Sequence, residues 1–184
     1  AAVVIGTAVL AVASRVEVPM IPVPITMQTY AVALIGALYG WRLGTITVLA
    51  WLAQAAIGLP VLASGKFGLA PFVGPTAGYL LAFPLMALLT GWLAERGWNG
   101  SRPGLAFAAM LAANALCLAL GAAWLSTLMG WEKAIAVGVT PFIIGGVLKS
   151  ALGALTLSTI FNTLAGIRED RPLGPYVAGN LTAG

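Results

Sequence analysis

The chain has 184 residues, of which 60% are hydrophobic and only 8% are charged, and its mean hydropathy is +1.00. A soluble domain carries roughly 25% charged residues, so this composition cannot cover a solvated surface and predicts an integral membrane protein. The net charge of +4 is small and scattered, which argues against nucleic-acid binding. Histidine is absent and Cys117 is the only cysteine, which excludes a catalytic histidine, internal disulfides and metal sites built on His or Cys.

Six hydrophobic stretches follow one another, and each is a candidate membrane-spanning helix. Together six spans use roughly 120 residues, which leaves short loops and no second soluble domain. We predict an all-α, six-transmembrane-helix bundle over residues 1–165 and a polar cytoplasmic tail over 166–184. The predicted spans are Ala1 to about Ser14, Thr26 to Tyr39, Leu43 to Leu59, Phe72 to Ala94, Leu105 to Leu128 and Pro141 to Ala165.

The connections between the first spans have distinct compositions. Pro19, Pro22 and Pro24 prevent a helix after the first span, because each fixes φ and removes a backbone donor. Gly40-Trp41-Arg42 leaves room only for a turn, which predicts a tight helical hairpin between the second and third spans. The first residue is not Met and the first span is short, so we expect the natural N-terminus to lie further upstream.

The positive residues predict an orientation in the membrane. If both termini share one side, five of the nine Lys and Arg residues lie on that side and three on the other, with Lys149 inside the sixth span. This excess predicts cytoplasmic termini, with segments 15–25, 60–71 and 129–140 facing outward. The cytoplasmic set is Arg42, Arg96, Arg102, Arg168 and Arg171, and the outer set is Arg15, Lys66 and Lys133.

Lys149 is the single charge inside a predicted span. It lies roughly 12 Å along the sixth helix from Pro141, at a depth where a Lys costs about 2.5 to 3.5 kcal/mol. Every Asp and Glu lies near a span end or in a loop, so no acidic partner is expected at that depth. Two interpretations stay open: an anionic ligand supplies the counter-charge, or the side chain extends along its aliphatic stem to the outer interface.

Uncharged polar residues also occur within or near the spans. Gln28, Tyr79 and Asn114 suit a ligand with a polar head group, although Asn114 serves equally well in hydrogen bonding between helices. For Gln54 we favour a structural role. Gly74 lies at the predicted start of the fourth span, where free backbone N–H groups and the positive end of the helix dipole can hold an anion or a carbonyl oxygen.

Small residues spaced four apart allow another helix to approach closely. Gly36, Gly40 and Gly44 have this spacing, although for Gly40 and Gly44 we prefer a role in the hairpin turn. In the first span the same spacing joins Ala2 to Gly6 and Thr7 to Ala11. That face could meet a partner subunit or the chain's own second helix, and the spacing does not separate the two.

Several stretches closely resemble the BioY family, the biotin-specific substrate-binding (S) components of energy-coupling factor (ECF) transporters. They are PVPITMQTYAVALIGALYGWRLG (22–44), IGLPVLASGKFG (57–68), FVGPTAGYLLAFPLMALLTGWLAER (72–96) and PFIIGGVLKSALGA (141–154). The similarity is collinear over nearly all of residues 18–165, and the GPTxGY stretch is its most specific part.

The resemblance implies a six-helix bundle of the ECF S-component type in the bacterial cytoplasmic membrane, with a biotin pocket near the outer face closed by the first and third loops. It implies a transmembrane coupling protein and a pair of ATP-binding cassette ATPases as partners within the lipid bilayer. Some relatives are thought to form homo-oligomers or to transport alone. The small residues of the first helix face the coupling protein in such systems, which makes Ala2, Gly6, Thr7 and Ala11 candidates.

The resemblance also assigns site residues. The family Lys of the last helix corresponds to Lys149, where it would meet the biotin carboxylate or another polar atom, and Tyr79 closes the GPTxGY motif, which also contains Gly74 and Thr76. The family often has an Asp three residues before the Lys, where this chain has Gly146. We hypothesise that Asn114, Gln28 or a backbone carbonyl takes over the contact with the ureido N–H groups.

The implied function is biotin binding and uptake, with no chemistry in this subunit and no cofactor besides the transported biotin. The chain has no GxxxxGK[ST] motif, so ATP hydrolysis is expected on partner chains. A membrane enzyme is disfavoured because no His or membrane-embedded Asp or Glu can act as acid or base. An S component of the same fold for another small vitamin and a biotin carrier without ATPases stay open, whereas a purely structural protein leaves Lys149 unexplained.

Overall fold

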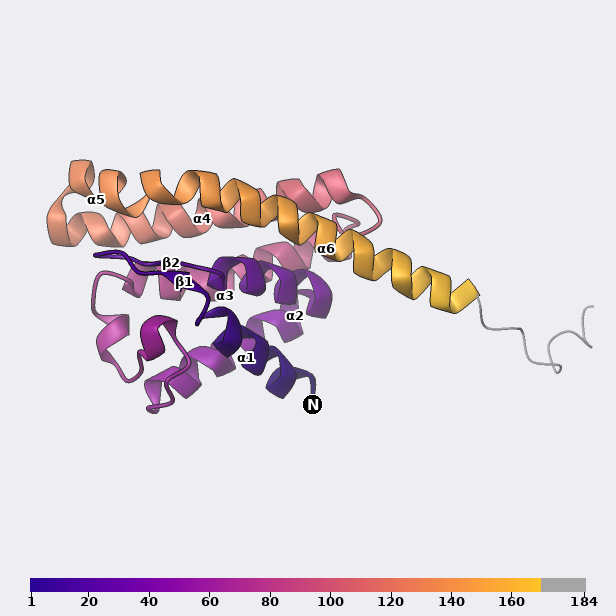
Figure 1. The fold of residues 1–184 in the computed structure, drawn as a ribbon, viewed down its shortest axis with the longest axis horizontal. Helices are drawn as coiled ribbons and strands as arrows, with labels where there is room; N and C mark the ends of the chain where they lie inside the picture. Colours follow the sequence, from indigo (N-terminus) through magenta and orange to yellow (C-terminus); the bar gives the residue numbers. More distant parts are fainter. Residues whose placement is uncertain (170–184) are drawn as a thin grey trace, which may run out of the picture.

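The computed structural model describes residues 1–169 and shows a bundle of helices of unequal length (Figure 1). The last helix runs to Glu169, past the predicted end of the sixth span at Ala165, and residues 170–184 of the predicted polar tail lie outside the described residues. The helices are α1 (Ala2–Ala13), α2 (Gln28–Ala56), α3 (Ala77–Glu95), α4 (Pro103–Met129), α5 (Trp131–Gly138) and α6 (Ile143–Glu169). The shorter elements are strands β1 (Glu17–Val18) and β2 (Ile25–Thr26) and the 3-10 turns η1 (Ala63–Gly65), η2 (Ala70–Phe72) and η3 (Thr140–Phe142).

The structure is mostly helical and its long helices are apolar, as the composition predicts, but the count of six spans is not confirmed. Within residues 1–169, four stretches are long and apolar enough to cross a membrane, and α1 is a shorter apolar helix. The four stretches are Gln28–Ala56, Ala77–Glu95, Pro103–Met129 and Trp131–Ile167. The difference of two arises because α1 is too short to count as a span and because the second and third predicted spans lie within one helix, α2.

The chain nevertheless reverses within α2 at Gly40. This residue has φ +78° and ψ 170°, which is not helical. A Cβ built on Gly44 would lie 2.9 Å from the Cα of Gly36, whereas eight residues of straight helix span about 12 Å. The two halves of α2 therefore pack directly on each other, as the predicted turn at 40–42 requires, and glycine supplies both the turn and the close approach.

Two predicted boundaries are wrong. The fourth span does not begin at Phe72, because η2 and the turn that contains Pro75 come first and α3 begins only at Ala77. The predicted loop 129–140 contains α5, which the positive φ of Gly130 (+82°) separates from α4. The chain thus turns sharply after α4 and forms a short helix before α6.

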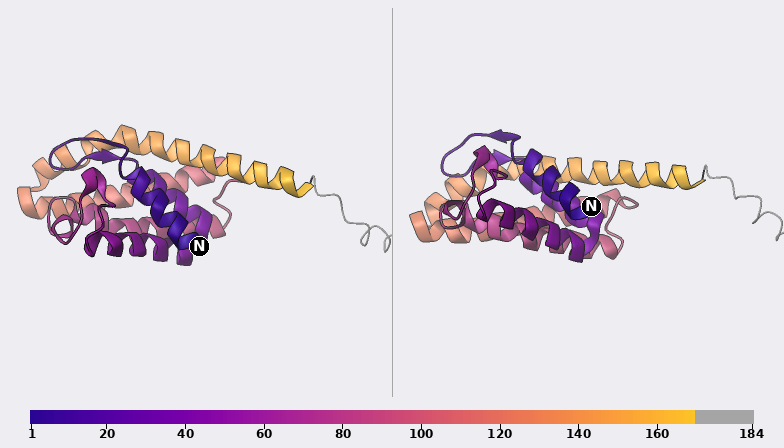
Figure 2. Two further views of the ribbon diagram at one scale, coloured as in Figure 1. Left: turned by 60° about the horizontal axis from the view of Figure 1, so that its bottom comes forward. Right: turned by 90° about the horizontal axis from the view of Figure 1, so that it is seen from below.

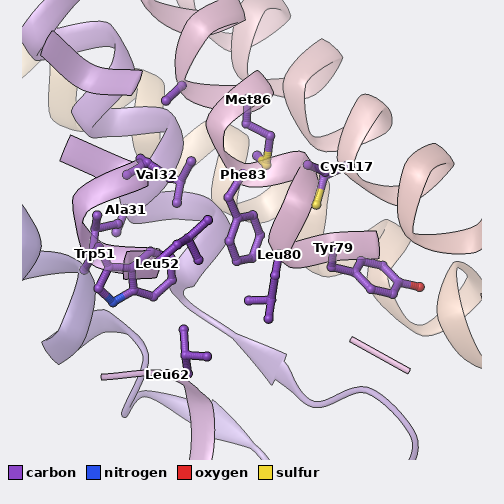
Figure 3. Packing of buried hydrophobic residues seen from close by; sticks show 14 of the residues in the cluster. Ala31, Val32, Trp51, Leu52, Leu62, Tyr79, Leu80, Phe83, Met86 and Cys117 are labelled. Atoms are coloured by element: carbon purple, nitrogen blue, oxygen red, sulfur yellow. The ribbon is translucent and has the colours of Figure 1, made fainter. Parts of the chain in front are cut away.

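The core joins α2, α3 and α4. Trp51 of α2 and Phe83 of α3 stack with ring centroids 5.9 Å apart, and both are almost fully buried. Figure 3 shows Met86 and Cys117 beside this pair. Small residues bring the helices together, since a Cβ on Gly36 would overlap Ala87 and Thr90 of α3. Dispersion contacts at this short distance hold helices together where lipid removes the hydrophobic drive.

Helix α1 packs on α2 through the small residues that the sequence singled out. Gly6 and Thr7 are buried, and a Cβ on Gly6 would lie against Thr47 and 3.1 Å from the Tyr39 ring. Ala2 and Ala11 are half-buried, and the carbonyl of Ala2 accepts a hydrogen bond from the Tyr39 hydroxyl (3.0 Å). The buried part of this face thus packs on the chain's own helix α2.

The β1–β2 ribbon, the loop between α2 and α3 and helix α5 lie at one end of the bundle, whereas the α3–α4 connection lies at the other, where Gly100 packs on Leu157 (Figure 1). Both views in Figure 2 place the β1–β2 ribbon and the loop before α3 at the same end, away from the protruding last turns of α6. In this ribbon, Glu17 pairs with Thr26 and Val18 with Ile25. Helices α2, α3 and α6 all begin at this end, and they surround the candidate site.

Candidate functional site

A partly enclosed cavity lies at the loop end of the bundle. Its walls come from the segment before α2, the loop 60–71, the start of α3, the middle of α4 and the start of α6. The lining is mainly apolar with a few polar groups, which is typical of small-molecule sites. The lining residues are Val23, Pro24, Thr26, Gln28, Thr29, Leu62, Ala63, Lys66, Pro71, Thr76, Tyr79, Leu80, Phe83, Asn114, Cys117, Leu118, Phe142, Gly146 and Lys149.

Lys149 lies in the wall formed by α6, and its ammonium points inward. It donates to the backbone carbonyl of Thr26 (2.9 Å) and to the hydroxyl of Thr29 (2.9 Å). These two partners, more than 100 residues earlier in the chain, hold the ammonium over the start of α2. This geometry places the Lys149 ammonium in the cavity wall, at the loop end of the bundle.

Gln28 lines the cavity, but its amide is engaged within the chain. The amide nitrogen donates to the hydroxyl of Ser14 (3.0 Å), and the amide oxygen accepts from the hydroxyl of Thr26 (3.0 Å). Gln28 is 5% exposed and Ser14 is fully buried. This network ties the end of α1 to β2 and to the start of α2, so it supports the residue whose carbonyl binds Lys149.

Asn114 forms hydrogen bonds between helices and also lines the cavity. Its amide nitrogen donates to the Met110 carbonyl (3.0 Å) and to the Ser150 hydroxyl (3.1 Å), which links α4 to α6. Its amide oxygen faces the cavity wall at Gly146, where an added Cβ would lie 4.0 Å away. The absent side chain of Gly146 therefore leaves room next to an acceptor oxygen.

The GPTxGY residues are divided between the cavity and its surroundings. The Tyr79 ring lines the cavity, but its hydroxyl donates to the Gly138 carbonyl (2.6 Å) and so holds α5. Thr76 lines the cavity as well. Gly74 does not: it borders a neighbouring outer hollow, and its carbonyl accepts a hydrogen bond from the Trp124 indole (2.8 Å).

Lys66, which we did not predict as a site residue, also lines this cavity. It lies on the loop 60–71 and borders both the main cavity and the outer hollow, at the mouth between them. Among the side chains of residues 1–167, no Asp or Glu lines the cavity, so its two formal charges there are both positive. The signal for Lys66 in the sequence was its place in a loop predicted to face outward.

Two polar contacts tie the loops that cover the cavity. The Arg15 guanidinium donates to the Pro60 carbonyl, and the Ser64 hydroxyl donates to the Glu17 carboxylate (2.8 Å). Glu17 lies in β1 and Ser64 in η1, so each contact joins the segment after α1 to the segment after α2. Gln54, by contrast, lies away from the cavity and donates to Thr7 (3.4 Å), which fits the structural role expected for it.

These features define a class: a multi-pass membrane protein with a largely apolar, positively charged small-molecule cavity at one end of its helix bundle. The chain belongs to the BioY family, which it matches over residues 1–166.

Named relatives and a solved structure agree with this assignment. The biotin transporter BioY of Rhizobium etli is 41% identical over 148 residues, which cover 76% of this chain and 79% of that protein. The BioY of Thermotoga maritima is 36% identical over 156 residues, covering 82% and 88%. The crystal structure of an S-component for biotin from an ECF-type ABC transporter superposes with a TM-score of 0.78 at 28% identity, covering 87% of this chain and 88% of that one.

Proposed function

We propose that this protein binds biotin at the loop end of its helix bundle and takes it up across the membrane as the substrate-specific subunit of an ECF-type transporter. The observation that carries the proposal is the cavity itself. It is mainly apolar, Lys66 and Lys149 line it, and no carboxylate of residues 1–167 does so. Biotin has a matching form, an apolar ring and chain with a carboxylate at one end and a ureido group at the other.

The proposed binding mode divides the ligand among these groups. Phe83, Leu80 and Leu118 contact the thiophane ring and the valeryl chain. Lys66 and Lys149 provide positive potential for the carboxylate or another ligand oxygen. The Asn114 amide oxygen accepts from a ureido N–H, taking the place of an acidic residue at Gly146. The role of Gln28 is indirect, because its amide is already bonded to Ser14 and Thr26.

The proposed topology has six crossings, with the two halves of α2 counted separately and α5 lying outside the membrane core. Both termini are cytoplasmic in this arrangement, and the cavity faces outward in the bacterial cytoplasmic membrane. The positive-residue count supports this orientation, since it places Lys66 outside and Arg96 inside.

A coupling protein and an ATPase pair complete the proposed transporter, and ATP is hydrolysed on those chains. No bond of biotin is made or broken in this subunit. Because Gly6 and Thr7 are buried against α2, the part of α1 available to a coupling protein is its exposed side, which includes Val4 and Ile5 (70% and 59% exposed). Ala2 and Ala11, which are half-buried, border that side.

Calorimetric titration of the detergent-purified, ligand-free protein with biotin and with neutral biotinamide tests the proposal. We expect tight biotin binding that weakens markedly for the amide, because loss of the ligand charge removes a charge-assisted contact of about 1.5 to 3 kcal/mol. Equal binding of both would retain biotin as the ligand and remove the charge contact. Absence of binding to folded protein would refute the proposed substrate and favour another vitamin.

A further inference from the structure

The hydroxyl of Thr29 differs from the other threonine hydroxyls in the helices. Thr45, Thr47 and Thr156 each donate to the carbonyl four residues earlier. Thr29 is the second residue of α2, so the residue four positions earlier is Ile25 in β2 rather than part of the helix. Among the hydrogen bonds of residues 1–169, the Thr29 oxygen accepts from Lys149 and its proton has no acceptor.

Lys149 also has one N–H donor without an acceptor among the described residues. An ammonium has three N–H donors, and the carbonyl of Thr26 and the hydroxyl of Thr29 take two of them. Both Lys149 and Thr29 line the cavity. One free N–H and one free O–H therefore lie side by side in the cavity wall, on heavy atoms 2.9 Å apart.

We propose that Thr29 is a specificity-determining residue that donates its hydroxyl proton to an oxygen of the bound ligand while its own oxygen fixes the Lys149 ammonium. The free N–H of Lys149 binds the same oxygen or its neighbour. Such a donor pair suits a carboxylate or a urea carbonyl, and it disfavours ligand groups that lack an acceptor oxygen. This inference rests on the proposed function and adds a contact to it.

The test measures the affinity for biotin of Thr29→Val and Thr29→Ser, alone and combined with Lys149→Met. Valine keeps the shape of threonine without the hydroxyl, and serine keeps the hydroxyl. We expect about a tenfold loss for T29V, since a hydrogen bond to a charged or buried group contributes at least about that factor. T29S should stay within about threefold. On the K149M background the T29V loss should fall below about threefold, because Thr29 then lacks the neighbour that orients it.

Thr45→Val is the matched control. Thr45 is also a half-buried threonine of α2, but it does not line the cavity and bonds the Trp41 carbonyl. We expect T45V to bind biotin as the wild type does.

Two biotin analogues identify which ligand oxygen accepts the Thr29 proton. If T29V no longer weakens binding of an analogue with a methyl group in place of the carboxylate, Thr29 contacts the carboxylate, and if it no longer weakens binding of 2-iminobiotin, Thr29 contacts the ureido oxygen; either result supports the proposal. An unchanged affinity in T29V overturns it. An equal loss for all three ligands also overturns it, because a packing defect does not distinguish them. Failure of the wild type to bind biotin would instead refute the proposed function.

Discussion

Replacing Tyr79 by Phe separates a contact with the ligand from a contribution to the stability of the fold. The substitution removes one hydroxyl and leaves the ring, which packs on Gly121. The centroid of this ring lies 6.2 Å from that of the Phe142 ring. In the structure this hydroxyl donates to the Gly138 carbonyl of α5. We therefore expect Tyr79→Phe to act mainly on the stability of the folded protein and only slightly on ligand affinity.

The expected loss of folding stability in Tyr79→Phe follows from the burial of Tyr79 and from its hydrogen bond. Tyr79 is 7% exposed, and its bond to Gly138 is short at 2.6 Å. A carbonyl left without its donor costs about 1 to 3 kcal/mol in water-soluble proteins, whereas hydrogen bonds between helices in a membrane average about 0.6 kcal/mol with a maximum near 1.7. We expect a loss of about 1 kcal/mol, which lowers the melting temperature by about 2–4 °C for a chain of this size.

The assay combines thermal unfolding in detergent with biotin titration. Tyr39→Phe is the control, because its hydroxyl bonds the Ala2 carbonyl (3.0 Å) at a site outside the cavity lining. Both variants should lose stability and keep biotin affinity within about threefold, since neither changes a ligand donor. A tenfold or larger loss of affinity in Tyr79→Phe, with its melting temperature unchanged, would refute the assignment of the hydroxyl to Gly138.

Three further predictions concern packing, polar recognition and charge. Gly91→Ala should destabilise the protein by about 2 kcal/mol or more, because the new Cβ would overlap the backbone at Trp41. Gly104→Ala, where a Cβ meets nothing within 4 Å, should leave the melting temperature unchanged or raise it slightly. Asn114→Ala should weaken biotin binding about tenfold by calorimetry, and unchanged binding would remove Asn114 from the site. Lys66→Ala should reduce the preference for biotin over biotinamide, and an unchanged ratio would assign that preference to other groups.

The sequence alone determined the class of protein and much of its outline. A composition with 8% charged residues fixes a membrane location whatever the fold. Gly40-Trp41-Arg42 predicted the reversal within α2 because it left the only room for a turn between two apolar stretches. Lys149 stood out because a charge within an apolar span has few structural uses. These features are local properties of composition and backbone, so they can be inferred without knowing which helices are neighbours.

The direction that each side chain faces was decided by the tertiary structure. In a soluble helix, polar residues mark the outer face, but lipid and protein interior are equally apolar, so a membrane helix lacks that contrast. For this reason the sequence could not decide whether Gly6 meets a partner or α2, and it did not identify Lys66 as a cavity residue. The sequence also could not predict the hydrogen-bond partners of Lys149, because Thr26 and Thr29 contact it only when α6 packs beside the start of α2.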